Sequence, residues 1–279
     1  MTKKLVFSGG LGNQMFQYAF LEVLRKHGKH IIADISLYRA IQMHNGFELN
    51  HVFNIQDHFW DRGGFYLFAL RCILHSDCGL LVAKEQKGVI DYFEENLCPF
   101  IKGDFQSELY FENYAEEIRK LFTFRDISIE NENLARQMRE TLSVSLHFRR
   151  GDYVSNSLYD NICSVSYYKS AIQVLSCLVN ADVTYFIFSN EVEWAHTFMM
   201  EYFPSLCYEI IDINSGKNSY MDMYLMSQCS HNIIANSSFS WWGAWLNQNP
   251  DKIVIAPKKW ANEEEFKYRN MVPKTWIKI

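Results

Sequence analysis

Apolar and polar positions follow two alternating periods along the second half of the chain. Short runs rich in β-branched and aromatic residues, typical of buried strands, occur at residues 143–148, 184–188, 208–212, 232–235 and 252–257. Between these runs, apolar residues spaced three or four positions apart predict helices at residues 167–178, 193–203, 219–227 and 239–246. Strands that alternate with helices are typical of α/β domains with parallel sheets, so we expect such a domain here.

The first half begins with the same rhythm. A strand at residues 5–8 is followed by a glycine-rich turn, a helix and a second strand at residues 30–34. The turn contains Gly9, Gly10 and Gly12, but it does not complete a dinucleotide-binding fingerprint because Met15 stands where the third glycine belongs. A tight structural turn and a close approach of the backbone to a ligand both fit this pattern.

The middle of the chain has the least regular pattern. We expect a helix at residues 59–81, a strand at 89–93, and amphipathic helices at 110–122 and 131–142. The polar stretch at residues 126–142 separates the two rhythmic halves. We therefore expect two domains, residues 1–135 and residues 136–279.

Three predicted strands of the second half end in polar clusters, at residues 147–152, 189–191 and 236–238. The carboxyl ends of parallel strands share one edge of a sheet, where ligands of α/β proteins bind. Arg149 and Arg150 would be costly there without an anionic partner, and the helix after Ser238 offers free N–H groups. The pattern favours a diphosphate site over its alternative, an arginine–aspartate cluster that closes a domain interface.

Aromatic and acidic residues near this edge have two readings each. Trp241, Trp242 and Trp245 fit the hydrophobic core better than a sugar-stacking surface. Asp222 stands near a predicted helix start, where a carboxylate is usually a cap or a partner of the helix dipole. The same carboxylate would match the paired N–H donors of guanine.

Composition narrows the class of protein. The 279 residues carry a net charge of −5 without a long basic run, which disfavours nucleic acid as a partner. The seven cysteines form no Cys-x-x-Cys pair, which disfavours a disulfide framework or a structural zinc site and favours a reducing cytoplasm. The longest apolar stretch, residues 65–74, is interrupted by Arg71, so we expect no membrane span and no leader peptide.

No Asp-x-Asp pair, which many nucleotide-sugar transferases use to hold a divalent cation, occurs in the sequence. Two arginines and a helix N-terminus stand where that cation would act. We therefore expect neutralisation of a diphosphate without a metal, and no cofactor.

Four segments carry a family resemblance. They are GGLGNQMFQYA at 9–19, HFRRGDY at 147–153, FSNE at 188–191 and IANSSFSWWGAWL at 234–246. Together and in this order they resemble the bacterial α-1,2-fucosyltransferases of glycosyltransferase family 11. The resemblance extends from residue 5 to about residue 257, and residues 40–125 contain no recognisable motif of the family.

The resemblance implies a GT-B-like α/β fold with two Rossmann-type domains whose parallel sheets face each other across a cleft. It implies an inverting transfer of L-fucose from GDP-L-fucose to the 2-hydroxyl of a galactoside in a surface glycan. Arg149 would grip the diphosphate with Arg150 in support, and His147 would lie against the nucleotide. The remaining donor contacts implied by the resemblance are Gly10, Gly12 and Asn13 from the first domain, and Asn190, Asp222, Ser237, Ser238, Phe239 and Ser240 from the second.

The general base is open at this stage. Asp152 is the first candidate because it follows the phosphate-binding arginines, and its alternative role is a salt bridge with Arg150. Glu191 and His147 are the other candidates, and a loose mechanism without a strong base also fits. This chain has Asn190–Glu191 where many bacterial relatives carry paired aspartates, which weakens any role that needs a carboxylate at position 190.

The acceptor and the location are less defined. The expected acceptor is a galactose-terminated oligosaccharide or a lipid-linked glycan, with Phe47, Trp60 and Tyr92 as candidate contacts. A lipid-linked acceptor suggests a cytoplasmic enzyme with peripheral contact to the inner membrane. The alternatives are a fucosyltransferase of another linkage or acceptor, such as protein O-fucosylation, a carbohydrate-binding protein without catalysis, and a nucleotide-sensing regulator.

Overall fold

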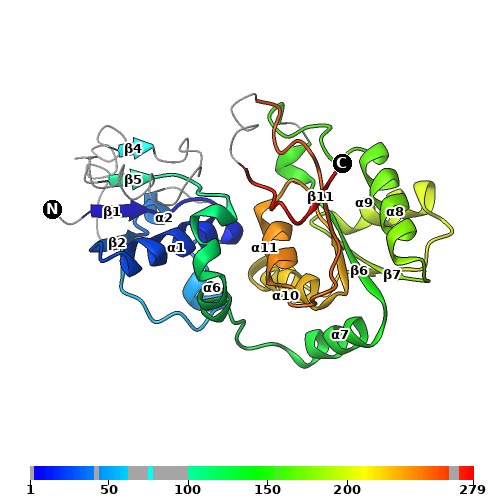
Figure 1. Ribbon diagram of the computed structural model, residues 1–279, viewed down its shortest axis with the longest axis horizontal. Coiled ribbons are helices and arrows are strands. Elements are labelled where there is room, and N and C mark those ends of the chain that lie inside the picture. Colours follow the sequence, from blue (N-terminus) through cyan, green and yellow to red (C-terminus); the bar gives the residue numbers. More distant parts are fainter. Residues whose placement is uncertain (1–2, 41–43, 62–74, 78–99, 155, 264–269) are drawn as a thin grey trace. The chain divides into compact units, whose positions relative to one another are not determined.

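The computed structural model describes residues 3–40, 44–61, 75–77, 100–154, 156–263 and 270–279 (Figure 1). The chain forms two compact units, one of residues 1–125 with 268–271 and one of residues 126–267 with 272–279. Each unit has its own sheet, and every strand pairing within the described residues is parallel apart from an isolated bridge between Phe53 and Phe124. The α/β class predicted from the sequence is therefore confirmed.

The described part of the first unit contains a sheet with strand order β3-β2-β1-β5-β4. Its strands are β1 (Lys3–Val6), β2 (Ile31–Asp34), β3 (Phe59–Trp60), β4 (His75–Asp77) and β5 (Phe100–Lys102). Its helices are α1 (Leu11–Lys26), α2 (Leu37–Ala40), α3 (Leu49–Val52) and α6 (Ala115–Leu121), with 3₁₀ turns η1 (Glu108–Tyr110) and η2 (Glu112–Tyr114). The glycine-rich turn lies between β1 and α1, at the carboxyl end of the central strand.

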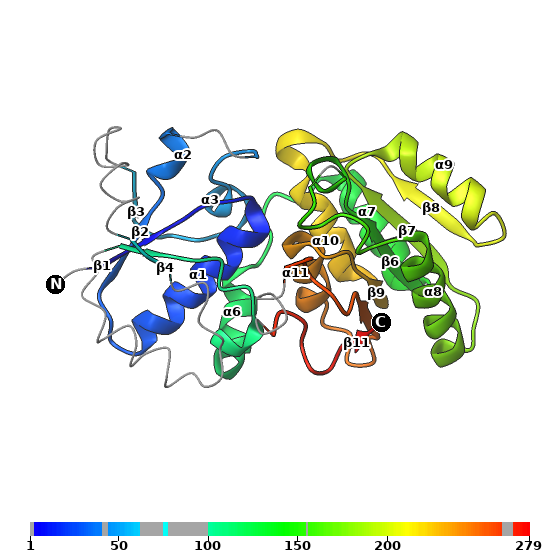
Figure 2. The same ribbon diagram turned by 90° about the horizontal axis from the view of Figure 1, so that it is seen from above.

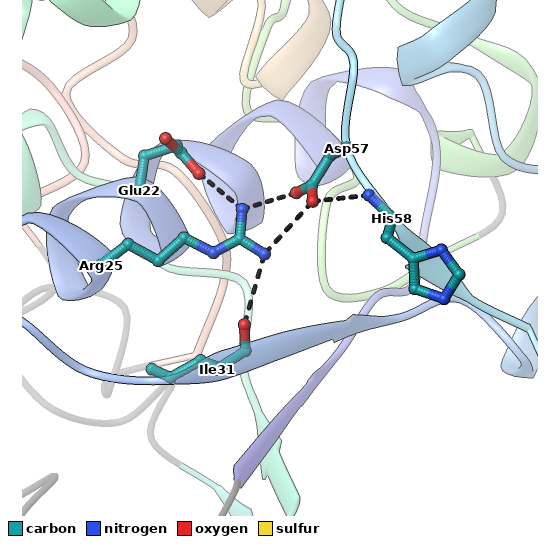
Figure 3. Close-up of polar contacts among 5 residues, drawn as sticks. All are labelled: Glu22, Arg25, Ile31, Asp57 and His58. Atoms are coloured by element: carbon teal, nitrogen blue, oxygen red, sulfur yellow. Dashed lines mark hydrogen bonds and ion pairs between the residues drawn. The ribbon is translucent and has the colours of Figure 1, made fainter.

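Helix α1 is fastened to the sheet by an ion-pair cluster near its C-terminal end (Figure 3). The Arg25 guanidinium donates to Glu22 Oε1 at 2.8 Å, to Asp57 Oδ2 at 2.5 Å and to the Ile31 carbonyl at 3.3 Å. The side chains of Arg25 and Asp57 are both mostly buried, so each charge depends on the other for stabilisation where little water reaches it. The cluster thereby joins α1 to the start of β2 and to the segment before β3.

Two sequence-based predictions for the first unit are wrong. Residues 59–81 were expected to be helical, but Phe59–Trp60 pairs with β2 and His75–Asp77 pairs with β5; residues 62–74 and 78–81 lie outside the described residues. Strand pairing is a long-range contact that local periodicity does not report. The helix expected at residues 110–122 is broken into η1, η2 and α6, because Phe111 leaves helical geometry (φ −140°) and its side chain is fully buried. The strand expected at residues 89–93 lies outside the described residues.

The described part of the second unit contains a sheet with strand order β11-β10-β9-β6-β7-β8. Its strands are β6 (Ser143–Phe148), β7 (Thr184–Ser189), β8 (Tyr208–Ile211), β9 (His231–Ile233), β10 (Val254–Ala256) and β11 (Ile277–Lys278). Its helices are α7 (Ile129–Glu140), α8 (Val165–Val179), α9 (Val192–Tyr202), α10 (Tyr220–Gln228) and α11 (Ser238–Leu246), with 3₁₀ turns η3 (Gly151–Tyr153) and η4 (Gly216–Asn218). These bounds agree within a few residues with the predicted elements, apart from β11, a strand of two residues that was not predicted. In the first unit β5 was not predicted either.

The helices of this unit cover both faces of its sheet (Figure 1, Figure 2). Val144, Leu146 and Phe148 of β6 pack with α8 and α9 on one face. Phe186 and Phe188 of β7 pack with α7 and α10 on the other face, where α11 lies against α10. His147 alternates with Phe148 along β6, so its ring belongs to the α10–α11 face.

A buried polar network joins α10 and α11 to the sheet. The Asn232 side chain donates to Ser145 Oγ at 2.7 Å and to the Met226 carbonyl at 2.8 Å. Its Oδ1 accepts a hydrogen bond of 2.8 Å from Asn247, the residue that ends α11. Because every buried polar atom of Asn232 has a partner, the network specifies how α11 is oriented on the sheet.

Candidate active site

The site lies where the strand order of the second unit reverses. Numbered within this unit, the order is 3-2-1-4-5-6, so the chain leaves β6 toward β7 on one side and later returns to β9 on the other. The loops after β6 and β9 therefore diverge at the carboxyl edge of the sheet, and such a point is the usual ligand site of open α/β sheets. The first loop contains the two arginines, and the second leads into the N-terminus of α11. The expectation that the polar ends of β6, β7 and β9 share one edge is confirmed by their pairing.

Arg149 follows β6 directly, and among the described residues it has one unsatisfied buried donor. Its Nη2 donates to Asp152 Oδ1 at 2.7 Å, and its guanidinium carbon lies 5.2 Å from the centre of the Tyr153 ring. Within the described residues, its buried Nε has no hydrogen-bond partner. The salt bridge expected between Asp152 and Arg150 is wrong, because Asp152 pairs with Arg149. The unsatisfied Nε of Arg149, next to an ion pair with the exposed Asp152 carboxylate, suits the binding of an anion.

Arg150 has a different environment. Its Nε donates to Glu191 Oε2 at 2.8 Å, and its backbone N–H donates to Asn190 Oδ1 at 2.9 Å. Its guanidinium carbon lies 3.9 Å from the centre of the Trp194 ring. In this structure the side chains of Arg150 and Asn190 therefore both bind other groups of the protein.

His147 is an uncharged group at physiological pH. It is 5% exposed, its ring lies 6.1 Å from that of Phe239, and its Nδ1 has no hydrogen-bond partner within the described residues. Burial, together with the nearby charge of Arg149, lowers the pKa of His147 to about 3. A base this weak holds a proton poorly at neutral pH, which counts against His147 as the general base.

The N-terminus of α11 lies at the same edge of the sheet, where the Phe239 ring is 6.1 Å from that of His147. Ser237 caps the helix, with its Oγ accepting from the Phe239 N–H at 3.4 Å, and the Ser240 hydroxyl donates back to the Ser237 carbonyl at 3.4 Å. Ser238 and Phe239 are half-buried, whereas Ser240 is buried. The first turn therefore presents backbone N–H groups and the positive end of the helix dipole rather than the Ser240 hydroxyl.

The three tryptophans of α11 belong to the core, as expected. Trp241 and Trp242 are fully buried, and Trp245 is nearly so. Trp241 packs against Trp276, with ring centres 5.4 Å apart. They anchor the helix and are not available to stack on a sugar.

Asp222 is held by a group of amides that sequence reasoning missed. It is the third residue of α10, and Ser219 rather than Asp222 occupies the N-cap position, so the cap interpretation is wrong. Asn214 Nδ2 donates to Asp222 Oδ1 at 2.8 Å, and Asn214 and Asn131 exchange two hydrogen bonds of 2.9 Å. Burial raises the pKa of Asp222 to about 7, so a small change of environment decides its charge. No local signal marks Asn131 and Asn214, which meet across 83 residues of sequence.

The glycine-rich turn of the first unit is a braced loop. Gly9 has a φ of +80° and its carbonyl accepts from Gln14 and from the Tyr38 hydroxyl. Gly10 precedes α1, and a side chain there would meet His44 at 3.2 Å. Gly12 is buried in the first turn of the helix. The turn thus needs glycine at position 9 for structural reasons alone, whereas a side chain at position 10 would require His44 to shift.

Residues around this turn have protein partners as well. Asn13 Oδ1 accepts a hydrogen bond of 2.7 Å from Gln106. Phe47, a candidate acceptor contact, packs against Phe59 with ring centres 4.6 Å apart. The Lys4 ammonium lies 3.2 Å from the centre of the Trp60 ring. The third candidate, Tyr92, lies outside the described residues.

No helix among the described residues is long and apolar enough to cross a membrane.

The fold is that of a known class of enzymes. The structure superposes on the NodZ α-1,6-fucosyltransferase soaked with GDP-fucose with a TM-score of 0.51 and 14% sequence identity, covering 88% of this chain and 93% of that one. This likeness supports the GT-B-like arrangement of parallel sheets expected above. At this level of identity the likeness shows the fold alone.

The family follows from sequence comparison. The model of glycosyl transferase family 11 matches residues 93–279, and the chain belongs to this family. An α-1,2-colitosyltransferase from Escherichia coli is 35% identical, over 98% of this chain and 97% of the relative. The O-antigen biosynthesis glycosyltransferase WbnK, also from Escherichia coli, is 30% identical, over 91% and 93%.

Proposed function

We propose that the protein transfers L-fucose from GDP-L-fucose to the 2-hydroxyl of a galactoside in a surface glycan, with inversion and without a metal. The observation that carries this proposal is the strand-order reversal, where Arg149 follows β6 and the start of α11 lies at the same edge, with the Phe239 ring 6.1 Å from that of His147. A guanidinium and a helix N-terminus together suit a diphosphate leaving group. The α-1,2 linkage and the O-antigen context are supported by the names of the two Escherichia coli relatives.

Different residues of the second unit bind different parts of the donor. Arg149 and the N–H groups of Ser238 and Phe239 bind the diphosphate and stabilise the charge that develops as the bond to the sugar breaks; the Phe239 N–H exchanges its 3.4 Å bond to Ser237 Oγ for the phosphate. One such preorganised donor contributes about 3 kcal/mol to the transition state. Asp222 accepts the N1–H and N2–H donors of guanine, and Asn214 holds its Oδ1 in place.

Asp152 is the general base in this proposal. The 2-hydroxyl of the acceptor attacks the anomeric carbon opposite the leaving group, the bond from that carbon to the phosphate oxygen breaks, and Asp152 takes the hydroxyl proton. The alternatives are weaker for physical reasons. Glu191 is committed to Arg150, which lowers the pKa of its carboxyl, and His147 has a pKa of about 3.

A colitosyl donor is the second candidate, because the 35% identical relative is named an α-1,2-colitosyltransferase. Colitose is the 3-deoxy counterpart of L-fucose, so the diphosphate and guanine contacts would be the same. The two donors differ by one hydroxyl, and a site that hydrogen-bonds this hydroxyl would reject the deoxy sugar strongly. Initial rates with GDP-fucose and GDP-colitose at equal concentration separate the two.

Calorimetric titration with GDP, ADP and UDP in EDTA tests the nucleotide site. We expect GDP to bind, ADP and UDP to bind at least tenfold more weakly, and Arg149→Ala to abolish the binding of GDP. Equal binding of the three nucleotides would remove the guanine role of Asp222, and no binding would remove the diphosphate site. NMR of the product made from a galactoside then reports linkage and anomeric configuration; transfer to a protein or to another hydroxyl would favour a fucosyltransferase of different acceptor.

The acceptor of this reaction is a galactose-terminated oligosaccharide or a lipid-linked glycan, and the enzyme acts in the cytoplasm with peripheral contact to the inner membrane. Co-flotation with vesicles that contain anionic lipid tests the membrane contact. A protein that stays entirely in the lipid-free fraction would remove it.

A further inference from the structure

The turn after β6 is held by the residues at the start of α9. Glu191, which directly precedes α9, uses both carboxylate oxygens: Oε2 accepts from Arg150 Nε at 2.8 Å and Oε1 accepts from the Gly151 N–H at 2.9 Å. Asn190 Oδ1 accepts from the Arg150 N–H at 2.9 Å. Three donors of a two-residue turn are therefore bound by two consecutive side chains from the neighbouring strand.

The backbone conformation that these contacts hold requires a glycine at position 151. Gly151 has a φ of +65°, a region that side chains other than glycine rarely adopt. A Cβ at this position would meet Asn190 Nδ2 at 2.8 Å, closer than a carbon atom is tolerated. Without Asn190 and Glu191, the turn would have many alternative conformations, because glycine is the least restricted residue in the chain.

The charge of Arg150 is used within this cluster. The guanidinium lies against Trp194 and donates to Glu191, and this contact keeps the pKa of the Glu191 carboxyl below its usual range. A charge-assisted bond between partly exposed groups holds best when further hydrogen bonds fix its geometry, as the Gly151 N–H does here. Arg149, in contrast, has an exposed carboxylate as its ion-pair partner, with Asp152 56% exposed.

We propose that Glu191 and Asn190 are positioning residues of the donor site, which lock Arg150 and Gly151 so that Arg149 presents its guanidinium to the diphosphate. The two arginines then have separate tasks: Arg149 contacts the donor, and Arg150 shapes the turn through Glu191. This inference rests on the diphosphate site proposed above, and it assigns roles to Glu191 and Arg150 that the reaction chemistry alone does not require.

The binding of GDP to a set of variants tests whether the two arginines have these separate roles. Calorimetric titration with GDP is performed on the wild type, Glu191→Ala, Arg150→Ala, the double variant and Arg149→Ala. A turn that is free in the unbound variant must be ordered when GDP binds, and this loss of entropy weakens binding. We therefore expect each single variant at positions 150 and 191 to bind GDP about tenfold more weakly. Because both changes break the same contact, the double variant should bind about as well as either single one.

Controls separate positioning from folding and from direct contact. Glu193→Ala removes an exposed carboxylate two residues further along and should leave the binding of GDP unchanged. The melting temperature of every variant is measured alongside. If Glu191→Ala does not fold, Glu191→Asp, which is one methylene too short to hold both donors, replaces it in the comparison.

The possible results have distinct meanings. If Arg150→Ala abolishes binding as Arg149→Ala does, while Glu191→Ala binds GDP as well as the wild type or better, then Arg150 contacts the diphosphate and the inference is overturned. Unchanged binding in both the Arg150→Ala and Glu191→Ala variants would overturn it as well. Unchanged binding in Arg149→Ala would refute the diphosphate site itself, which is a separate failure.

Discussion

In the proposed mechanism Asp152 and the diphosphate share the positive charge of Arg149, and this makes Asp152→Asn the most informative single change. In the structure Asp152 Oδ1 accepts from Arg149 Nη2 at 2.7 Å, with the two side chains 56% and 23% exposed. A diphosphate bound to the other donors of Arg149 would compete with this carboxylate for the same charge and weaken the ion pair. The carboxylate would then stand beside the donor and could take the acceptor's proton. Asparagine keeps the size of the side chain and removes its negative charge.

The two consequences of this substitution have opposite signs. An ion pair as exposed as this one contributes about 0.2–1 kcal/mol, so its loss should tighten the binding of GDP by about 1.5- to 5-fold. Loss of a general base slows transfer by about 10²- to 10⁴-fold. We therefore expect Asp152→Asn to bind GDP more tightly than the wild type while it transfers fucose at least a hundredfold more slowly.

Two assays on the same preparations test this expectation: titration calorimetry with GDP in EDTA, and initial rates of GDP release with a galactoside acceptor at saturating donor. Asp160→Asn is the matched control, because it removes a carboxylate from the same loop that forms no ion pair with Arg149. Weaker GDP binding in Asp152→Asn would mean that Asp152 orients Arg149 instead of competing for it. An unchanged rate of transfer would refute its role as the base.

The remaining predictions concern pH and stability. Burial raises the pKa of Asp222 from 3.8 to about 7, so between these pH values the folded chain holds a proton that the unfolded chain has lost. The free energy of unfolding, relative to that of Asp222→Asn, should therefore fall as the pH rises from about 4 to about 7 and stay level above it. Urea unfolding at pH 5, 6 and 8 measures this difference, and a constant difference would contradict the burial. The Lys252 ammonium donates to the Ala244 and Asn247 carbonyls at the end of α11, so Lys252→Met should lower the free energy of unfolding by about 1–3 kcal/mol in urea titration, with no change as the refuting result. Arg25→Ala leaves Asp57 mostly buried without its ion-pair partner and should cost about 2–4 kcal/mol, whereas Arg39→Ala breaks an exposed pair and should cost less than about 1 kcal/mol; equal losses would show that burial of the pair has no effect.

The second unit could be predicted from sequence because its strands are short apolar runs with clear ends. The predicted strands at residues 143–148 and 184–188 agree with β6 and β7 to within one residue. Such runs are buried on both faces, so their pattern needs no knowledge of the neighbouring strand. The position of Arg149 at a ligand-binding edge followed from the same reasoning, since parallel strands bring their carboxyl ends together.

The segment from residue 40 to residue 125 was harder to predict because its described strands β3, β4 and β5 have only two or three residues and many of its apolar residues are aromatic. Phe59–Trp60 pairs with β2 over two residues, which is less than one period of any pattern. The aromatic residues around it suit a helix and a strand equally well. In such a segment the partner decides the structure, and the partner lies more than twenty residues away.

The sequence alone determined the α/β class, the order of elements in the second unit and the residue types at the ends of its strands, because these depend on local periodicity and turn chemistry. The tertiary structure alone decided which group each of those residues binds. Asp152 pairs with Arg149 and Glu191 with Arg150, although both acids follow arginines in the same edge cluster. Burial made His147 a neutral ring and raised the pKa of Asp222. The Arg150–Asn190 and Asn131–Asn214 contacts join segments 40 and 83 residues apart, and no local pattern in the chain encodes them. Even the local Arg149–Asp152 pair depends on how the turn after β6 folds.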